Sequence, residues 1–146
     1  MSPASPVPPE AVQIAEDSYR RCGQDHFFPA FYQRLLASHP AIAPKFAKTD
    51  FQKQHKLLQH GIGLLLIFAK RQNPALLERI AGRHAPHDID IGPELYPFFV
   101  DSLLATVRQF DPQVNAEVED AWRQALAPGI AFLIAARTPS GPGAGA

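Results

Sequence analysis

The sequence lacks several features that would assign it to common functional classes. One cysteine, Cys22, among 146 residues excludes an internal disulfide framework and a cysteine-rich zinc site. Fourteen basic and fourteen acidic residues leave no formal net charge, which argues against a nucleic-acid-binding protein. The longest apolar run, near residues 61–69, is too short to cross a bilayer, and no dinucleotide-binding glycine motif is present.

Both ends of the chain are poor in residues that could form a core. Residues 1–8 are rich in proline but have neither a basic start nor an apolar stretch, so they do not form a signal peptide. Residues 138–146 contain Pro, Ser, Gly, Ala and a single Thr, a composition typical of a disordered tail or a linker. We therefore expect two disordered ends around one domain at 9–137, in a cytoplasmic protein that does not enter membranes.

Fifteen prolines are many for a chain of this length, and several stand where helices would start. Proline is favoured at the first helical position because that residue needs no amide donor. Thr49 and Gln52 have the spacing of a capping box, in which the glutamine side chain reaches back to the threonine amide. The sequence predicts helices that begin near residues 9, 25, 40, 50, 74, 93 and 112.

Between these starts, apolar residues recur at intervals of three and four, the period of a helix. Leu57, Leu58, Ile62, Leu65 and Leu66 show this period, and no segment alternates as a strand would. The predicted helices differ greatly in length, whereas an up-and-down four-helix bundle has helices of similar length. The pattern predicts an irregular all-α domain.

Histidines are the candidate metal ligands. His84 continues the apolar face of its predicted helix, where an imidazole needs a hydrogen-bond partner or a metal, and both interpretations remain open from this feature. His55 and His60 are five residues apart on different faces, and Pro86 separates His84 from His87. A zinc site is therefore disfavoured. A single axial ligand to a large flat cofactor is the better metal hypothesis.

Aromatic residues cluster before residue 50, and a neutral amide follows them. The run 27–32 contains three phenylalanines and Tyr32, and Phe46 comes later. Such spacing is usual for core residues, but a tyrosine hydroxyl among them needs a buried hydrogen bond. Gln54 stands near the start of the next helix, where exposure to solvent is the alternative to a role in a pocket.

Taken in order, these segments resemble the globins, in particular the single-domain bacterial globins and the haem domains of flavohaemoglobins. The resemblance spans about residues 9–137 and implies an all-α globin fold, a three-over-three helical sandwich around a haem pocket. Each motif is weak alone, and five in the right order and spacing are specific. The motifs lie at residues 31–40 with Phe46, at 54–58, at 80–84, at 96–104 and at 121–122.

The resemblance implies a role for each matching residue around haem b, iron protoporphyrin IX. His84 would be the iron ligand, and Phe46 would stack on the porphyrin. Tyr32 and Gln54 would line the distal side, where they donate hydrogen bonds to the partial negative charge of bound dioxygen, and Leu58 would crowd the ligand. The remaining candidates are Arg83 and His87 at the haem propionates, and Tyr96 and Phe99 in the pocket.

A rival alignment would place His60 at the distal position, because His60 and Gly61 look like the distal pair of animal myoglobins. Only 24 residues would then separate the distal residue from His84, whereas Gln54 gives 30, which is close to the usual separation in the family. We therefore prefer Gln54 and expect His60 to be exposed.

The resemblance implies reversible binding of dioxygen, and also of carbon monoxide and nitric oxide, with no catalytic residue of its own. Two other functions remain open: a nitric oxide dioxygenase served by a separate reductase, and the sensor domain of a longer signalling protein. Arg137 stands about where flavohaemoglobins carry a glutamate, which puts the dioxygenase in doubt because a cation cannot accept a proton from imidazole. A helical bundle without cofactor is the remaining alternative. The helices that contain residues 96–104 and 121–122 are candidate faces of a homodimer.

Overall fold

The fold is built from helices of very unequal length. The structure, a computed structural model, describes residues 7–23, 25–47, 49–71, 75, 77 and 93–137. Within these residues all regular structure is helical, which confirms the predicted all-α class. The α-helices are α1 (Pro9–Cys22), α2 (Phe27–Ser38), α3 (Phe51–Arg71), α5 (Tyr96–Phe110) and α6 (Ala116–Arg137), and the 3-10 helices are η1 (Ala43–Phe46) and η2 (Pro93–Leu95).

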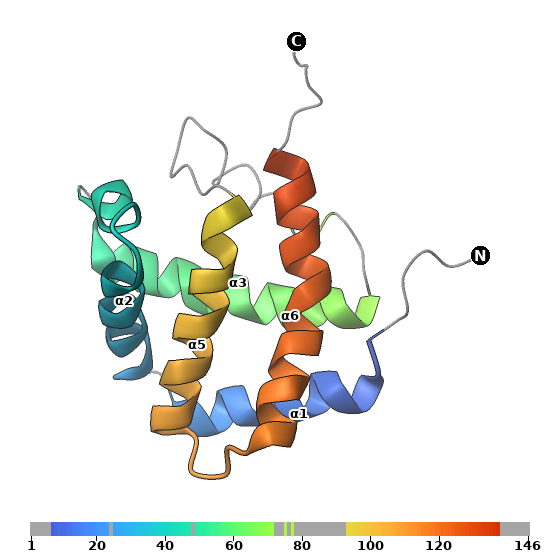
Figure 1. Cartoon of the computed structure of the whole chain (residues 1–146). Helices are drawn as coiled ribbons and strands as arrows, with labels where there is room; N and C mark the ends of the chain where they lie inside the picture. Colours follow the sequence, from blue (N-terminus) through green and yellow to red (C-terminus); the bar gives the residue numbers. More distant parts are fainter. Residues whose placement is uncertain are drawn as a thin grey trace.

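The helices cross one another in two layers (Figure 1). Helices α5 and α6 run side by side, and α1 and α3 cross behind them. The most extensive contacts join α6 to α1 and to α3, and α5 to α2. The start of α3 is thereby held next to α2, and these two helices carry the residues of the distal side that the sequence analysis predicts.

The core lies between these layers and consists of the faces predicted from the helical period. Phe27 and Phe31 of α2, Ile62 and Leu66 of α3, and Trp122 of α6 are almost completely buried. Burial of side chains of this size contributes about 1.5–3 kcal/mol each relative to exposure, so the apolar faces fix which side of each helix turns inward.

The predicted capping box before α3 is wrong. The Thr49 amide donates to the carbonyl oxygen of Phe46, at 3.1 Å, and so is not available to Gln52. Asp50 caps the helix instead, because its Oδ1 accepts the backbone N–H of Gln52 at 3.1 Å and that of Lys53 at 3.4 Å. An aspartate at this position satisfies amides that have no partner within the helix.

Two predicted helix starts are displaced. Residues 40–42 form a turn, and the short helix that was expected near Pro40 begins at Ala43 as η1. The last helix begins at Ala116 and not near Pro112. Its cap is Asn115, whose Oδ1 accepts the Val118 N–H at 2.9 Å. The expected starts near 25 and 93 correspond to Phe27 and to the short helix that precedes α5.

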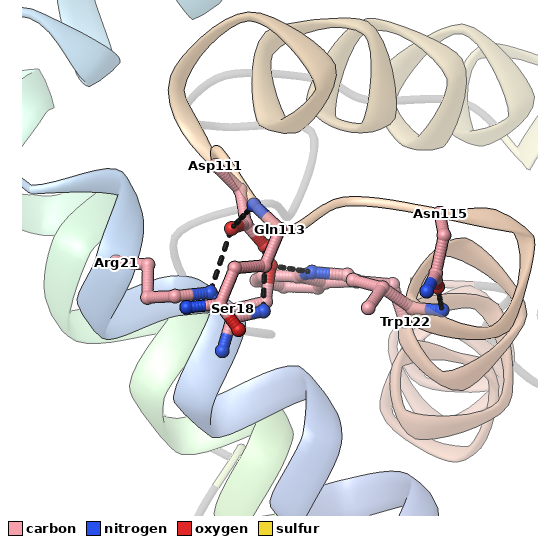
Figure 2. Close-up of polar contacts among 7 residues, drawn as sticks. Ser18, Arg21, Asp111, Gln113, Asn115 and Trp122 are labelled. Carbon is pink, nitrogen blue, oxygen red and sulfur yellow. Dashed lines mark hydrogen bonds and ion pairs between the residues drawn. The ribbon is translucent and has the colours of Figure 1, made fainter.

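Asp111 caps no following helix because its carboxylate is the centre of a buried polar network (Figure 2). Arg21 of α1 donates to both carboxylate oxygens, from Nε at 2.6 Å and from a terminal nitrogen at 2.8 Å. The Ser18 hydroxyl donates to Oδ2 at 2.6 Å, and it accepts the Trp122 indole N–H at 2.9 Å. The Gln113 amide also donates to Oδ1, at 2.9 Å. This network joins α1, the α5–α6 turn and α6.

The network also controls the charge on Asp111. Burial alone raises the pKa of this carboxyl, but the hydrogen bonds from Arg21, Ser18 and the Gln113 amide outweigh burial and bring the pKa below its ordinary value. The hydrogen bond to Asp111 likewise raises the pKa of Arg21. The buried charge is therefore compensated, which is the condition for a buried ion pair to be tolerated.

We predict that Asp111→Ala lowers the free energy of unfolding by about 3 kcal/mol, since it leaves the buried Ser18 hydroxyl and the Arg21 guanidinium without their acceptor. Urea unfolding measures the loss. Glu119→Ala is the matched control, because it removes the carboxylate of the more exposed pair with Arg108 and is expected to cost at most about 1 kcal/mol. Equal losses in the two variants would contradict the role of the network.

The pH dependence has a definite sign. Because the folded-state pKa of Asp111 is depressed, its stabilisation is complete above the ordinary aspartate pKa, near pH 4, and is lost as the pH falls through the folded value. In Asp111→Asn this component of the acid destabilisation should be absent.

Candidate functional site

Tyr32 of α2 lies at the centre of a cluster of rings. Its side chain is buried, with only 4% of the residue exposed. Its ring contacts those of Phe31, Phe46 and Phe51 edge-on, with centroid distances of 5.1, 5.8 and 5.5 Å. His55 stacks on it at 5.4 Å with an angle of 24° between the planes. Two helices and the segment between them therefore fix one phenol.

Gln54 of α3 completes the polar part of the site. Its Nε2 donates to the Tyr32 hydroxyl oxygen at 3.0 Å, and its side chain is half-buried. The cap formed by Asp50 sets where α3 starts, and Gln54 lies in the first turn. A direct hydrogen bond thus joins Tyr32 and Gln54, the two residues expected on the distal side of a pocket.

The chemistry of this pair favours donation to a ligand. Burial raises the pKa of Tyr32 to about 12, and the hydrogen bond from Gln54 lowers it only in part, so the phenol keeps its proton at neutral pH. The hydroxyl accepts from Gln54 and donates to no residue that the structure describes. A ligand oxygen placed close to this hydroxyl could therefore accept its proton in a hydrogen bond.

Apolar side chains that follow Gln54 on α3 or pack on Phe31 from α5 have the chemistry that suits the faces of a large flat cofactor. Leu57 and Leu58 follow Gln54 by one helical turn. Leu57 is 37% exposed, and Leu58 is half-buried. On α5, Phe99 is half-buried and its ring contacts that of Phe31 at 5.5 Å. A porphyrin offers an extended apolar surface, so these residues suit haem, and the Tyr32 donor suits a polar ligand bound to it.

Six of the nine residues predicted for the cofactor pocket lie among the described residues. Their burial ranges from nearly complete in Tyr32 to partial in Gln54, Leu58 and Phe99. Arg83, His84 and His87 lie outside the described residues, so the proposed iron ligand stays a prediction. His60 is exposed, as expected. The buried members of the set are Tyr32, Phe46 and Tyr96.

Sequence reasoning missed two rings of the site, those of Phe51 and His55. The relevant signal was their four-residue spacing at the start of α3, which places both on one face of the helix. The sequence pattern indicated His55 only as a possible metal ligand. Its position against Tyr32 depends on how α3 crosses α2, which no local pattern determines.

Two other features, a metal-binding cluster and a membrane-spanning helix, are absent from the described part of the chain. No group of three or more His, Cys, Asp or Glu residues is arranged there to hold a metal ion. Among the same residues, no helix is long and apolar enough to span a membrane.

Comparisons with known proteins agree with the geometry. The sequence model of the Globin family matches residues 29–131. The chain is similar to a Pseudomonas aeruginosa protein whose crystal structure is described as structurally highly homologous to a human hemoglobin. That likeness has 38% identity and a TM-score of 0.82, and it covers 87% of this chain and 98% of the other. The chain matches none of the curated proteins with which it was compared.

We predict that Tyr32 titrates near pH 12, well above the ordinary tyrosine value of 10. Because the folded-state pKa is raised, ionisation of this tyrosine in the unfolded chain lowers the free energy of unfolding once the pH exceeds about 10. NMR of tyrosine labelled at the ring Cζ measures the midpoint, and Tyr32→Phe assigns the signal. A midpoint near 10 would contradict the enclosed position of the phenol.

Proposed function

We propose, because the chain belongs to the globin family, that it binds haem b and reversibly binds dioxygen and other diatomic gases. Family membership implies the haem cofactor. The proposal that the bound gas is dioxygen is carried by one observation: a buried Tyr32 hydroxyl that accepts from Gln54, keeps its proton at neutral pH and donates it to none of the described residues.

Haem, when bound, supplies the iron atom on which a diatomic gas is held. The chain's own residues set the environment of that gas. Tyr32 donates its phenol proton toward the ligand, and Gln54 holds the phenol oxygen at 3.0 Å so that the donor points in one direction. A hydrogen bond to a partly charged acceptor in a site of low dielectric constant is stronger than one in water, and this strength slows release of the gas.

Apolar residues perform the second task, exclusion of water. Leu58 and the rings of Phe46 and Phe99 provide the dry surface beside the polar pair. We assign the iron bond to His84 on the resemblance of residues 80–84 to the proximal helix of globins. In this role one imidazole nitrogen binds the metal, and the other donates to a backbone carbonyl or a nearby side chain.

We propose a binding protein in preference to a nitric oxide dioxygenase on account of Arg137. Flavohaemoglobin-like chains carry a glutamate at about this position, which strengthens the electron donation of the iron ligand. An arginine cannot accept the imidazole proton, and electron donation through His84 is correspondingly weaker.

His84→Ala should abolish stable haem retention or remove the fifth ligand of the iron. Added imidazole should restore the ligand, because a free imidazole can enter the space that the side chain leaves. Gel filtration of the haem-loaded protein measures retention, and the ferrous absorption spectrum reports coordination. A variant with the wild-type ferrous spectrum would exclude His84 as the ligand, and His60→Ala, at an exposed position, is the matched control.

Tyr32→Phe removes the phenol donor and keeps the ring. Loss of a hydrogen bond to a partly charged acceptor costs about 1.5 kcal/mol or more, so the dioxygen dissociation rate should rise about tenfold or more. Stopped-flow displacement by carbon monoxide measures this rate. Tyr19→Phe is the control, because its hydroxyl bonds the Gln59 carbonyl away from the cluster. An unchanged rate in Tyr32→Phe would remove Tyr32 from the proposed function.

A further inference from the structure

An open cavity of about 340 Å³ lies on the outer side of α2 and α3. Polar side chains of α3 and apolar side chains at the start of α2 line it, and Tyr32 is not among them. His55 is the lining residue whose ring also stacks on Tyr32. One imidazole therefore borders both the solvent-filled cavity and the buried phenol. The lining residues are Asp25, Phe28, Pro29, Gln52, His55, Lys56 and Gln59.

We propose that His55 is a positioning residue for the distal site: its ring holds the Tyr32 phenol in its hydrogen-bonding orientation and separates it from the water of this cavity. The functional consequence rests on the proposed function, because the orientation of Tyr32 matters for gas release only if a ligand accepts its proton. The enclosure of the phenol itself does not depend on haem.

The geometry supports a stack of rings more than a polar contact. His55 and Tyr32 lie nearly parallel, at 24°, whereas the other rings around Tyr32 meet it at 63° to 74°. The edge-on rings come from Phe31, Phe46 and Phe51. His55 thus covers one flat face of the phenol. Among the described residues, no other ring is stacked on that phenol.

The imidazole suits this position because it is neutral at physiological pH. Burial lowers the pKa of His55, so the uncharged form is retained. The ring of Phe51, one turn earlier on α3, also packs on the imidazole, with a distance of 6.2 Å between the ring centroids, and keeps the imidazole over Tyr32. Gln54 hydrogen-bonds the hydroxyl of the phenol, and His55 stacks on the face of its ring. Two consecutive residues of α3 thus fix the hydroxyl and the ring of Tyr32.

Three variants separate a stacking role from general damage. His55→Ala removes the ring, His55→Phe keeps a flat ring without the polar nitrogens, and Gln59→Ala removes a cavity-lining side chain that makes no ring contact with Tyr32. The Gln59 carbonyl, which accepts from the Tyr19 hydroxyl, is preserved in that control.

Nitration of tyrosine at pH 8 gives a readout that is independent of gas binding. The phenolate is the reactive form, and its fraction at fixed pH rises tenfold for each unit by which the pKa falls. His55→Ala should raise the nitration rate of Tyr32 by up to about a hundredfold as its pKa returns from about 12 toward 10. His55→Phe and Gln59→Ala should leave the rate unchanged. Peptide mass spectrometry identifies each site, and constant rates at Tyr19 and Tyr96 show that the fold is intact.

The dioxygen dissociation rate tests the same idea through a double-mutant cycle. His55→Ala should raise the rate in the wild-type background and have no further effect in the Tyr32→Phe background, because His55 acts through the phenol. A Tyr32→Phe effect without a His55→Ala effect would overturn the positioning role alone. If Tyr32→Phe had no effect, Tyr32 would be removed from the proposed function, and nitration would then decide the positioning role. An unchanged Tyr32 nitration rate in His55→Ala, or equal rates in His55→Ala and His55→Phe, would overturn that role.

Discussion

The arrangement of the helices depends on the ion pair and the hydrogen bonds of the buried Asp111 carboxylate. Asp111 is only 2% exposed, and its carboxylate accepts from Arg21 and Ser18 of α1 and from the Gln113 amide in the turn after α5. The indole N–H of Trp122, the only tryptophan of the chain, donates to the Ser18 hydroxyl. In the sequence, Arg21 and Ser18 stand 90 and 93 residues before Asp111, and Trp122 stands 104 residues after Ser18. A network of this kind is satisfied only when α1 and α6 are packed in one relative position. The network therefore fixes the relative position of α1 and α6, two helices against which α3 packs.

Helix α6, which packs against α1, also crosses α3, and α3 carries residues of the site. Gly129 lies at this crossing, and a Cβ there would collide with the Cδ2 atom of Leu65. The absence of a side chain leaves room for the Leu65 side chain, so α6 and α3 approach closely at this point. The first turns of α3 then present Gln54 and His55 to the phenol of Tyr32. The hydrogen bond between Gln54 and Tyr32 thus depends on how α3 crosses the other helices, an arrangement that Figure 1 shows.

Local patterns were sufficient for the helical class and for the inward faces, because helical periodicity carries that information. Only the resemblance to the globins led us to expect Tyr32 and Gln54 on the same side of a pocket, and their direct hydrogen bond is seen in the structure alone. They failed where a residue has two possible partners. Asp111 before Pro112 has the pattern of a helix start, but the carboxylate is used by Ser18 and Arg21, and the cap is Asn115. Thr49 has the pattern of a capping box, but its amide bonds the Phe46 carbonyl. Such choices are decided by tertiary contacts that a local window does not contain.

Our central claim is that this chain binds a diatomic gas on haem, beside Tyr32 and Gln54. The absorption spectrum of the purified, haem-loaded protein tests the binding of gas on haem most directly, in the ferric and ferrous forms and with and without carbon monoxide. We predict a sharp Soret band that shifts when carbon monoxide is added after reduction. A protein that takes up no haem, or whose ferrous Soret band does not respond to carbon monoxide, would contradict it.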